Sequence, residues 1–246
     1  MITAIIITLN EEKNIPKALE SVKDLADEVI VVDCGSKDKT VELAKEFGAK
    51  VFIREFDNFA NQKNWAVLKA SNEWILSLDA DEIISKELAG EIKIAIQDNN
   101  YSGYLIPRRN FILGAEIKHS RWSPDSHIWL WKKDKGKWVG DVHEEVKVLG
   151  KIGLLKSAKI HNSHQSVTDF IEANDQYSDL ESQILFSNKV PFSFLKMIKM
   201  SAFEFCIRFF YKRGFLDGWR GFTLSYLMAI YQLMVWIKLW DLEKNK

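Results

Sequence analysis

The sequence is poor in cysteine and carries no excess of either charge. Its 246 residues include two cysteines, Cys34 and Cys206, which stand far apart. Such isolated thiols exclude a disulfide framework and a cysteine-bound metal cluster, and they fit a reducing compartment. The 34 basic and 34 acidic residues cancel, so the net charge of the whole chain indicates no particular partner.

Repeats, low-complexity tracts and a secretory signal are also missing. The first residues, "MITAIIITLNEE", contain an apolar run too short for a signal peptide and no basic segment before it. With 47% hydrophobic and 28% charged residues, the composition is typical of a globular protein rather than a disordered one. The length suits one or two domains with a sizeable core, and we expect a cytoplasmic protein.

Charge is nevertheless unevenly distributed along the chain. From Val190 onward there are nine basic and four acidic residues, so the rest of the chain is acidic by the same excess. Within this basic part, residues 222–237 carry no charge, but a membrane-spanning helix needs about 20 apolar residues. We therefore expect amphipathic helices that lie on a membrane surface, and no nucleic acid partner. The alternative is a helix pair buried against the domain or in a homo-oligomer.

Strands and helices are predicted to alternate in the first hundred residues. Apolar runs predict strands, and capping residues with Pro16 and Gly48 mark helix ends. The predicted strands are 2–8, 28–33, 50–54 and 73–79. One predicted helix begins at about residue 14, and the others cover 38–47, 58–70 and 85–97. This alternation is typical of a parallel sheet covered on both faces. After residue 99 we expect mixed β structure, and helices from Val167 onward.

Polar side chains follow three of these strands at the point where each strand ends. Ligands bind beyond the carboxyl ends of strands in such sheets, where Asn10, Asp33 and Asp79 lie. Asp79 and Asp81 stand two residues apart and can face one ligand together. Carboxylates suit Mg²⁺ or Mn²⁺, although a lone D-x-D is more often a polar strand end. Gly35 allows the backbone after Asp33 to approach a ligand.

Four segments strengthen this interpretation because of their order and spacing. They are "IITLNEEKNI", "VIVVDCGSKDKT", "FANQKNWAV" and "WILSLDADE". Together they resemble family 2 of the inverting, nucleotide-sugar-dependent glycosyltransferases, over roughly residues 1–110. Three later segments, "GDVHEEV", "KIHNSH" and "KRGFLDGWRGF", are similar to a bacterial subgroup that builds the lipopolysaccharide core, notably the β-1,4-glucosyltransferase acting on inner-core heptose.

The resemblance implies an α/β fold of the GT-A type, a Rossmann-like, mostly parallel sheet flanked by helices. It also implies a C-terminal amphipathic helical extension. Residues 1–166 would form the catalytic domain, in which residues 1–100 bind the nucleotide sugar and residues 101–166 bind the acceptor. Residues 167–246 would form the extension, which we expect to associate with the membrane.

Site residues are implied by the same resemblance. Asp33 would contact the uracil of a UDP-sugar, and Asp81 would bind the Mg²⁺ or Mn²⁺ ion that stabilises the leaving UDP. Asp79 would approach the ribose or the metal, and His161 would complete the metal shell. The remaining nucleotide-sugar contacts would be Thr8, Asn10, Glu11, Gly35, Lys63 and Ala80.

Inversion requires one general base, which takes the proton of the attacking acceptor hydroxyl. The segment "DVHEEV" offers Asp141, Glu144 and Glu145, and we predict Glu144, oriented by His143. Asp125 is the alternative base. The alternative for His161 is a structural role, because a single histidine is more often structural than a metal ligand.

Two positions depart from the pattern of the family, and three arginines have no settled role. Cys34 stands where many relatives have a second acid, and Trp129 stands where relatives often have arginine. Arg108, Arg109 and Arg121 either bind phosphates of the donor or acceptor, or they lie at the surface.

The predicted function is metal-dependent transfer of a hexose, with glucose favoured, from a UDP-sugar to a lipid-linked saccharide such as the lipopolysaccharide inner core. The reaction would take place at the inner face of the cell membrane, where the protein is peripherally bound. Other acceptors are a polyprenyl phosphate or another glycolipid. A different class remains open, an inactive scaffold that binds nucleotide sugars. Nucleotidyl transfer is disfavoured because "LNEEKNIP" lacks a glycine-rich loop.

Overall fold

The computed structural model of the chain describes residues 1–140 and 144–245, in two compact units. The first, here called the sheet unit, comprises Met1–Arg109 and Asp125–His161. The second, here called the helical unit, comprises Asn110–Pro124 and Asn162–Lys246. The chain therefore passes between units at three places, whereas the sequence predicted one boundary after residue 166. The predicted roles of the domains stay predictions.

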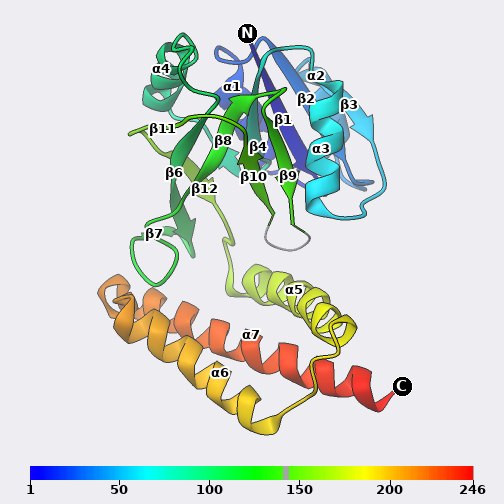
Figure 1. Cartoon of the computed structure of the whole chain (residues 1–246), viewed down its shortest axis with the longest axis vertical. Coiled ribbons are helices and arrows are strands. Elements are labelled where there is room, and N and C mark those ends of the chain that lie inside the picture. Colours follow the sequence, from blue (N-terminus) through cyan, green and yellow to red (C-terminus); the bar gives the residue numbers. More distant parts are fainter. Residues whose placement is uncertain (141–143, 246) are drawn as a thin grey trace. The chain divides into compact units, whose positions relative to one another are not determined.

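Four parallel strands form one half of the main sheet, in the order β3-β2-β1-β4 (Figure 1). They are β1 (Ile2–Thr8), β2 (Glu28–Asp33), β3 (Lys50–Ile53) and β4 (Trp74–Asp79). These are the strands predicted from apolar runs, which arise because a parallel sheet is covered on both faces. In register, Thr8 lies beside Asp33, and Ile7 lies beside Asp79.

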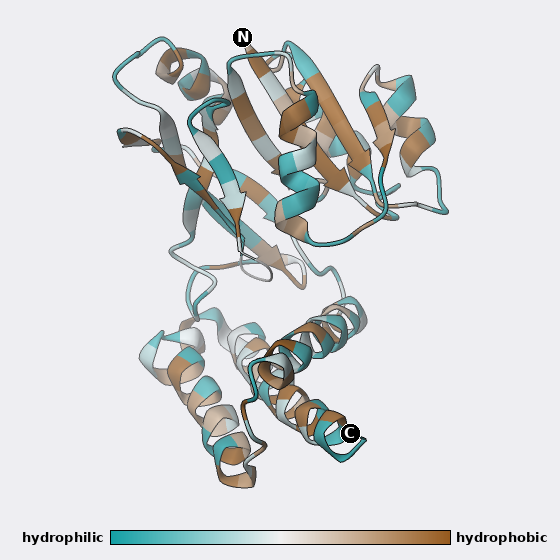
Figure 2. Ribbon diagram, turned by 45° about the vertical axis from the view of Figure 1, so that its right-hand side comes forward, coloured by the Kyte–Doolittle hydropathy of each residue, from teal (hydrophilic) through white to brown (hydrophobic). Residues whose placement is uncertain are grey.

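Further strands complete the sheet, which Figure 2 shows in a turned view, and confirm the mixed β structure predicted after residue 99. They pair with their neighbours in antiparallel fashion, except for β11, which runs parallel to β6. β8 (Ser126–Lys132) pairs with β4, and the order continues through β6, β12 and β5. The other strands of this part are β5 (Glu82–Ile83), β6 (Gly103–Ile112), β7 (Ala115–Ile117), β11 (Ile152–Leu154) and β12 (Lys159–Asn162). A separate hairpin consists of β9 (Gly136–Val139) and β10 (Glu145–Val148).

The four helices of the sheet unit begin and end near the predicted signals. They are α1 (Ile15–Val22), α2 (Thr40–Glu46), α3 (Phe59–Lys69) and α4 (Lys86–Ala95). Asn58 caps α3 by accepting from the backbone N–H of residue 61, and Ser85 caps α4 in the same way. Asp38 precedes α2 by two residues, and its carboxylate accepts from the N–H of Thr40.

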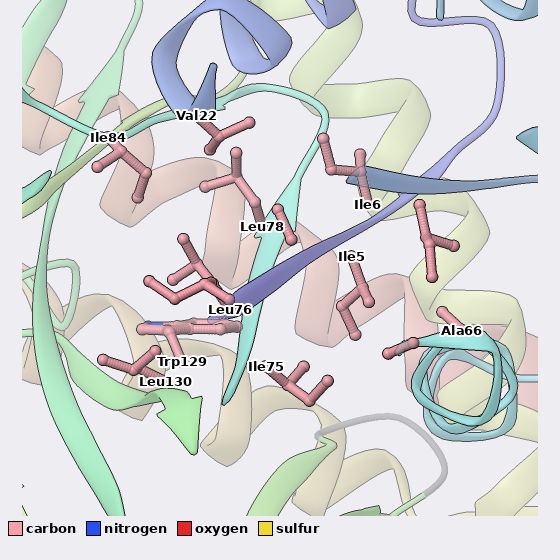
Figure 3. Close-up of a cluster of buried hydrophobic side chains, with 14 of the residues drawn as sticks. Ile5, Ile6, Val22, Ala66, Ile75, Leu76, Leu78, Ile84, Trp129 and Leu130 are labelled. Carbon is pink, nitrogen blue, oxygen red and sulfur yellow. The ribbon is translucent and has the colours of Figure 1, made fainter. Parts of the chain in front are cut away.

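The core of the sheet unit lies on both sides of β1 and β4. Figure 3 shows Ile5 and Ile6 of β1 with Leu76 and Leu78 of β4 in one cluster of buried side chains. Helix α1 contributes a buried face at the spacing i, i+3, i+4 and i+7. The indole of Trp129, from β8, closes one side of this cluster (Figure 3). Hydrophobic burial on both faces thus fixes the carboxyl ends of the strands, where the polar residues lie.

The helical unit contains three long helices, coloured yellow to red in Figure 1. They are α5 (Val167–Ser187), α6 (Phe194–Cys206) and α7 (Gly218–Lys244), and α7 contacts both others. A π-helical turn (Ile207–Tyr211) and a 3₁₀ turn (Gly214–Asp217) separate α6 from α7. At Gly221, an added Cβ would lie 1.8 Å from the carbonyl oxygen of Gly214, so this close approach requires glycine.

Candidate active site

The loops after β1 and β2 form one hydrogen-bonded structure at the carboxyl edge of the sheet. Asn10 has a left-handed backbone (φ +55°), and its N–H donates to the Ser36 hydroxyl at 2.7 Å. Its side-chain oxygen accepts from the N–H of Lys37 at 2.8 Å. The N–H of Glu11 donates to the Thr40 hydroxyl at 2.7 Å. Loops that are held in this way offer a fixed backbone to a ligand at the end of the strands.

Asp33 is fully buried at the end of β2 and shapes the turn that follows it. Its Oδ1 accepts from the N–H of Gly35 at 2.9 Å and from the N–H of Ser36 at 2.8 Å. Its Oδ2 accepts from the Ser36 hydroxyl. Gly35 has φ +97°, a conformation that favours glycine. The predicted contact of Asp33 with uracil stays a prediction, because this carboxylate here binds its own turn.

Thr8 and Glu11 bring less satisfied polar groups to the same edge. The Thr8 hydroxyl is buried and has no hydrogen-bond partner among residues 1–140 and 144–245. Burial raises the pKa of Glu11, and the neighbouring charges of Asp81 and Asp38 add to this effect. A buried hydroxyl without a partner costs free energy, which a ligand that reaches the strand end would recover.

Asp79 and Asp81 lie at the end of β4, as the sequence predicted. An Oδ1 of Asp79 lies 3.3 Å from the Lys63 Nζ, and an Oδ2 of Asp81 lies 3.1 Å from the His161 Nε2. Residue 161 reaches this place because β12 pairs with β5, where it lies opposite Glu82. Burial alone would lower the pKa of His161, but its hydrogen bond with Asp81 raises it. The structure therefore pairs two of the three predicted metal ligands, Asp81 and His161, and Asp79 lies two residues before Asp81 at the same strand end.

The donor set of two carboxylates and one imidazole fits Mg²⁺ or Mn²⁺, because these ions take few protein ligands and bind substrate phosphates as well. Within the described ranges, no three acidic, histidine or cysteine side chains already converge as a metal cluster. Burial would raise the pKa of Asp79, but the charges of Lys63 and Lys159 lower it well below its usual range. Asp79 is therefore ionised at neutral pH, as a metal ligand has to be.

Lys63 connects this carboxylate pair to the predicted base. Its ammonium group is buried and lies 3.0 Å from an Oε1 of Glu144, while also facing Asp79. The ring of Trp138 covers it, with 4.4 Å from Nζ to the ring centroid. Burial would lower the pKa of Lys63, but Asp79 and Glu144 raise it. A charged lysine thus bridges the predicted metal ligand and the predicted base.

A second buried ion pair, between Glu82 and Lys159, lies directly behind the carboxylate pair. The Lys159 Nζ donates to Oε2 of Glu82 at 2.5 Å, and both side chains are fully buried. The same Oε2 accepts from the N–H of Asp79 at 3.0 Å, so Glu82 holds the backbone of the metal-ligand turn. Burial lowers the pKa of Lys159 to about 8. Its Nζ lies 3.2 Å from the ring centroid of Trp129.

The sequence predicted no role for Glu82 or Lys159. A basic residue inside the apolar segment "LLKSAKIHN" was the available signal, because lysine is almost never fully buried unless it is paired. Its partner stands 77 residues earlier, so the pairing itself had no local signal.

Asp125 is held by basic groups on both of its oxygens. Oδ2 accepts from Nε of Arg108 at 2.7 Å, and Oδ1 lies 2.8 Å from Nε2 of His127. Arg108 also donates to Oε1 of Glu82 at 3.3 Å. Arg108, for which a phosphate contact was one prediction, therefore links the alternative base to the buried pair behind Asp79.

The other predicted residues have different surroundings. Ala80 is buried between the two aspartates, and Arg109 is exposed. Burial raises the pKa of the Cys34 thiol, whose sulfur accepts a hydrogen bond from Gln62 at 3.1 Å. In the helical unit, Arg121 pairs with Glu204. Asp141 and His143 lie outside the described residues.

Comparisons with known proteins agree with this geometry. A sequence model described as glycosyl transferase family 2 matches residues 3–145. An uncharacterized glycosyltransferase of Rickettsia typhi is 31% identical over 255 residues, which cover 98% of this chain and 87% of the relative. The lipopolysaccharide core biosynthesis glycosyltransferase LpsC of Rhizobium meliloti is 27% identical over 98% of this chain and 92% of its own length.

Solved structures are similar in fold. Glucosyl-3-phosphoglycerate synthase from Mycobacterium tuberculosis superposes with a TM-score of 0.52 at 16% identity, over 78% of this chain and 81% of that chain. TarS from S. aureus superposes with a TM-score of 0.50 at 19% identity. The match covers 72% of this chain but 39% of TarS, so this chain corresponds to less than half of that protein.

Proposed function

The chain belongs to glycosyl transferase family 2 and has the GT-A fold, and from this premise we propose that it transfers a hexose, with inversion, from a UDP-sugar to a lipid-linked saccharide. The observation that carries the proposal is the convergence at the end of β4. There, Asp81 pairs with His161, and Lys63 joins Asp79 to Glu144.

The donor would bind at the carboxyl ends of β1, β2 and β4. The loop from Thr8 to Glu11 and the turn after Asp33 would receive the nucleoside. Asp79, Asp81 and His161 would hold a divalent ion, which supplies positive charge to the diphosphate as it leaves. Glu82 keeps the turn between the two aspartates in place through its bond to the N–H of Asp79.

Glu144 is the proposed base, and the structure favours it over Asp125. Asp125 gives one oxygen to Arg108 and the other to His127. Among the described residues, Glu144 has a single cationic partner, Lys63. A base needs an oxygen that can approach the acceptor hydroxyl, and it takes that proton while the hydroxyl oxygen attacks the anomeric carbon opposite the leaving UDP.

Lys63 would hold Glu144 in position before the acceptor arrives. Its ammonium group is covered by the ring of Trp138 and shielded from water, which strengthens both of its ion pairs. A base that is oriented by a buried partner loses less conformational freedom in the reaction, and this lowers the barrier.

The acceptor is proposed to be a lipid-linked saccharide of the lipopolysaccharide inner-core type, met at the inner face of the cell membrane. Support comes from the LpsC relative, whose name gives that pathway, and from the basic, aromatic C-terminal part of the chain. Glucose is the proposed sugar on the same resemblance. The buried ammonium group of Lys63, held between Asp79 and Glu144, speaks against an inactive scaffold, because buried charges without a function are costly.

A direct test measures UDP release from UDP-glucose, UDP-galactose and UDP-N-acetylglucosamine in the presence of Mn²⁺ and a purified inner-core lipopolysaccharide acceptor. We expect acceptor-dependent release with UDP-glucose, and a product in which the new linkage has inverted anomeric configuration by NMR. Retained configuration, or no acceptor-dependent release from any of the three UDP-sugars, would contradict the proposal.

A further inference from the structure

Helix α7 passes the length and composition test for a membrane span, but it is also the central helix of its unit. The stretch Gly214–Lys244 has a mean hydropathy of 1.4 in its most apolar window, of which 39% is buried inside the protein. One side of α7 packs on its neighbours, where Leu224, Val235 and Leu239 are buried. A helix with this much protein contact has one face left for another partner.

Polar bonds fasten α7 to α5. The Nζ of Lys238 lies 2.7 Å from a carboxylate oxygen of Asp175 and 2.7 Å from one of Asp179. The Tyr231 hydroxyl donates to a carboxylate oxygen of Glu181. Because these pairs are formed within the unit, α7 would have to break the bonds of three carboxylates to leave α5.

The other side of α7 exposes large apolar side chains along its whole length. Trp219, Phe222, Tyr226, Ile237 and Trp240 are between 44% and 60% exposed. Their spacing places them on one side of the helix, roughly 140° around the axis from the side chains that reach α5. Tryptophans lie at both ends of this stripe, as they do in helices at a membrane–water interface.

The stripe continues onto the turns that connect α6 to α7. The ring of Phe222 lies 5.6 Å from Phe209 and 6.2 Å from Tyr226, measured between centroids. Beside these rings lies a hollow of about 590 Å³ with apolar lining. We call the whole exposed surface the apolar face, and it comprises Phe203, Phe210, Tyr211, Phe215, Leu216, Trp219, Phe222, Tyr226, Ile237 and Trp240. Soluble monomers rarely expose an apolar area of this extent.

Charge near the apolar face is basic, whereas α5 is acidic. Exposed lysines and arginines accompany the face, and two acids of the same region are already bound: Glu204 pairs with Arg208, and Asp217 with His119. The exposed basic residues are Lys196, Lys199, Lys212 and Arg213. Helix α5 contains Asp169, Glu172, Asp175, Asp179 and Glu181, and no basic residue. One side of the helical unit therefore attracts anions, and α5 repels them.

These observations decide among three occupants. A spanning α7 would carry the acidic α5 into the hydrocarbon, where charges are expelled. A second copy would place the basic residues near their own copies, where like charges repel. An anionic lipid surface satisfies both features, because the aromatic side chains enter the interface and the basic ones meet lipid phosphates.

We propose that the helical unit docks on an anionic membrane surface through the apolar face, with α7 lying in the plane of the interface and α5 on the aqueous side. The inference deepens the proposed function, because it names the surface where a lipid-linked acceptor is met. The contacts that carry it belong to the helical unit alone and are independent of the chemistry at Asp79 and Asp81.

Flotation of the full-length protein with lipid vesicles tests the proposal. We expect binding to phosphatidylcholine vesicles that contain about 30% phosphatidylglycerol, and weak binding to phosphatidylcholine alone. The double variant Phe210→Ser/Trp219→Ser should lower the partition coefficient at least ~10-fold, because both side chains would enter the interface. The matched control, Leu68→Ser/Ile94→Ser, removes two even more exposed apolar side chains from the sheet unit and should bind as the wild type does.

Charge is tested separately with Lys199→Glu/Lys212→Glu, which should weaken binding to the anionic vesicles and leave the small binding to neutral vesicles unchanged. Thermal unfolding by circular dichroism confirms that each variant is folded. If the aromatic pair and the control pair lose binding equally, the apolar face is not the docking surface.

Two further outcomes would overturn the orientation. Protein that stays with vesicles after both high salt and alkaline carbonate would indicate a span. A dimer by light scattering that the Phe210→Ser/Trp219→Ser variant converts to a monomer would assign the face to a second copy. UDP binding, measured on the same samples without vesicles, separates this proposal from the enzymatic one. The docking variants should still bind UDP. If no variant and no wild-type protein bound UDP, the result on membrane docking would still stand.

Discussion

The sheet unit and the helical unit differ in how much charge they bury and how much apolar surface they expose. In the sheet unit, Glu82 and Lys159 are fully buried as a pair, and Lys63 is buried between two carboxylates. In the helical unit, the Glu204–Arg208 pair is also buried, but the ion pairs of Lys238 lie at the surface, and side chains such as Trp219 are more than half exposed.

The difference follows from what each unit has to hold. Buried charges cost folding free energy, and a buried ion pair is seldom a net gain in stability. Their concentration behind Asp79 and Asp81 is therefore explained by the need for fixed geometry at a site that changes charge. The exposed apolar side chains of the helical unit cost solubility, and a lipid surface that covers them explains their presence.

The largest expected effect is the loss of the buried pair. Lys159→Met leaves Glu82 buried without its closest cation, and we expect the free energy of unfolding to fall by about 3–5 kcal/mol. The matched variant, Lys238→Met, breaks a pair at the surface of the helical unit and should cost about 1 kcal/mol or less. Urea unfolding of both variants measures the contrast. Equal losses would mean that the two units do not differ in this respect.

A second prediction concerns how stability depends on pH through Glu28, which lies at the edge of the sheet opposite the site. Burial would raise the pKa of Glu28, but hydrogen bonds from Lys50, Thr3 and Ser71 lower it from 4.5 to about 2. The carboxylate therefore stabilises the fold by about 3 kcal/mol above pH 4.5, and this is lost as the pH falls from about 4.5 to about 2. Glu28→Gln should be less stable than the wild type at pH 7, with a difference that shrinks towards pH 3 in chemical unfolding. A difference that does not change with pH would contradict this account.

The next effect concerns the base. Glu144→Gln should retain binding of UDP and reduce turnover by about 100-fold, because it removes proton transfer and keeps the shape of the side chain. Steady-state kinetics separate KM from kcat. Asp125→Asn is the comparison, and a larger loss of kcat in that variant than in Glu144→Gln would assign the base to Asp125.

The smallest expected effects come from two glycines, one in each unit. Gly221→Ala should cost about 1–3 kcal/mol, since the new methyl group would overlap the carbonyl of Gly214. Gly90→Ala lies in α4 with open space around it and should stabilise the fold by about 0.5–1 kcal/mol. Thermal unfolding gives both signs. A neutral Gly221→Ala would show that the start of α7 can move away from the 3₁₀ turn.

Much of the first hundred residues was predictable because its signals are local. Continuous apolar runs marked β1, β2 and β4, and Asn58 and Ser85 marked helix starts. The carboxylates of Asp79 and Asp81 were predictable from their place at a strand end. A resemblance carried by four segments added the GT-A fold.

Long-range pairing was not predictable in the same way. The pairing of β12 with β5 brings His161 to Asp81, and no local pattern fixes it. The same pairing buries Lys159 against Glu82, although a lysine in a sequence is normally expected at the surface. The crossings of the chain between the two units near residues 110 and 124 also depend on tertiary packing, since no composition change marks them.

The measurement that tests the central claim most directly is calorimetric titration of the protein with UDP, with and without Mn²⁺, beside GDP and CDP. The account predicts binding of UDP that requires Mn²⁺, is lost in Asp81→Ala and is kept in Asp134→Ala, which removes an exposed acid of the same unit. Binding of UDP that is unchanged without Mn²⁺ or in Asp81→Ala would contradict the assignment of the metal site. No binding of any nucleotide would contradict the proposed function itself.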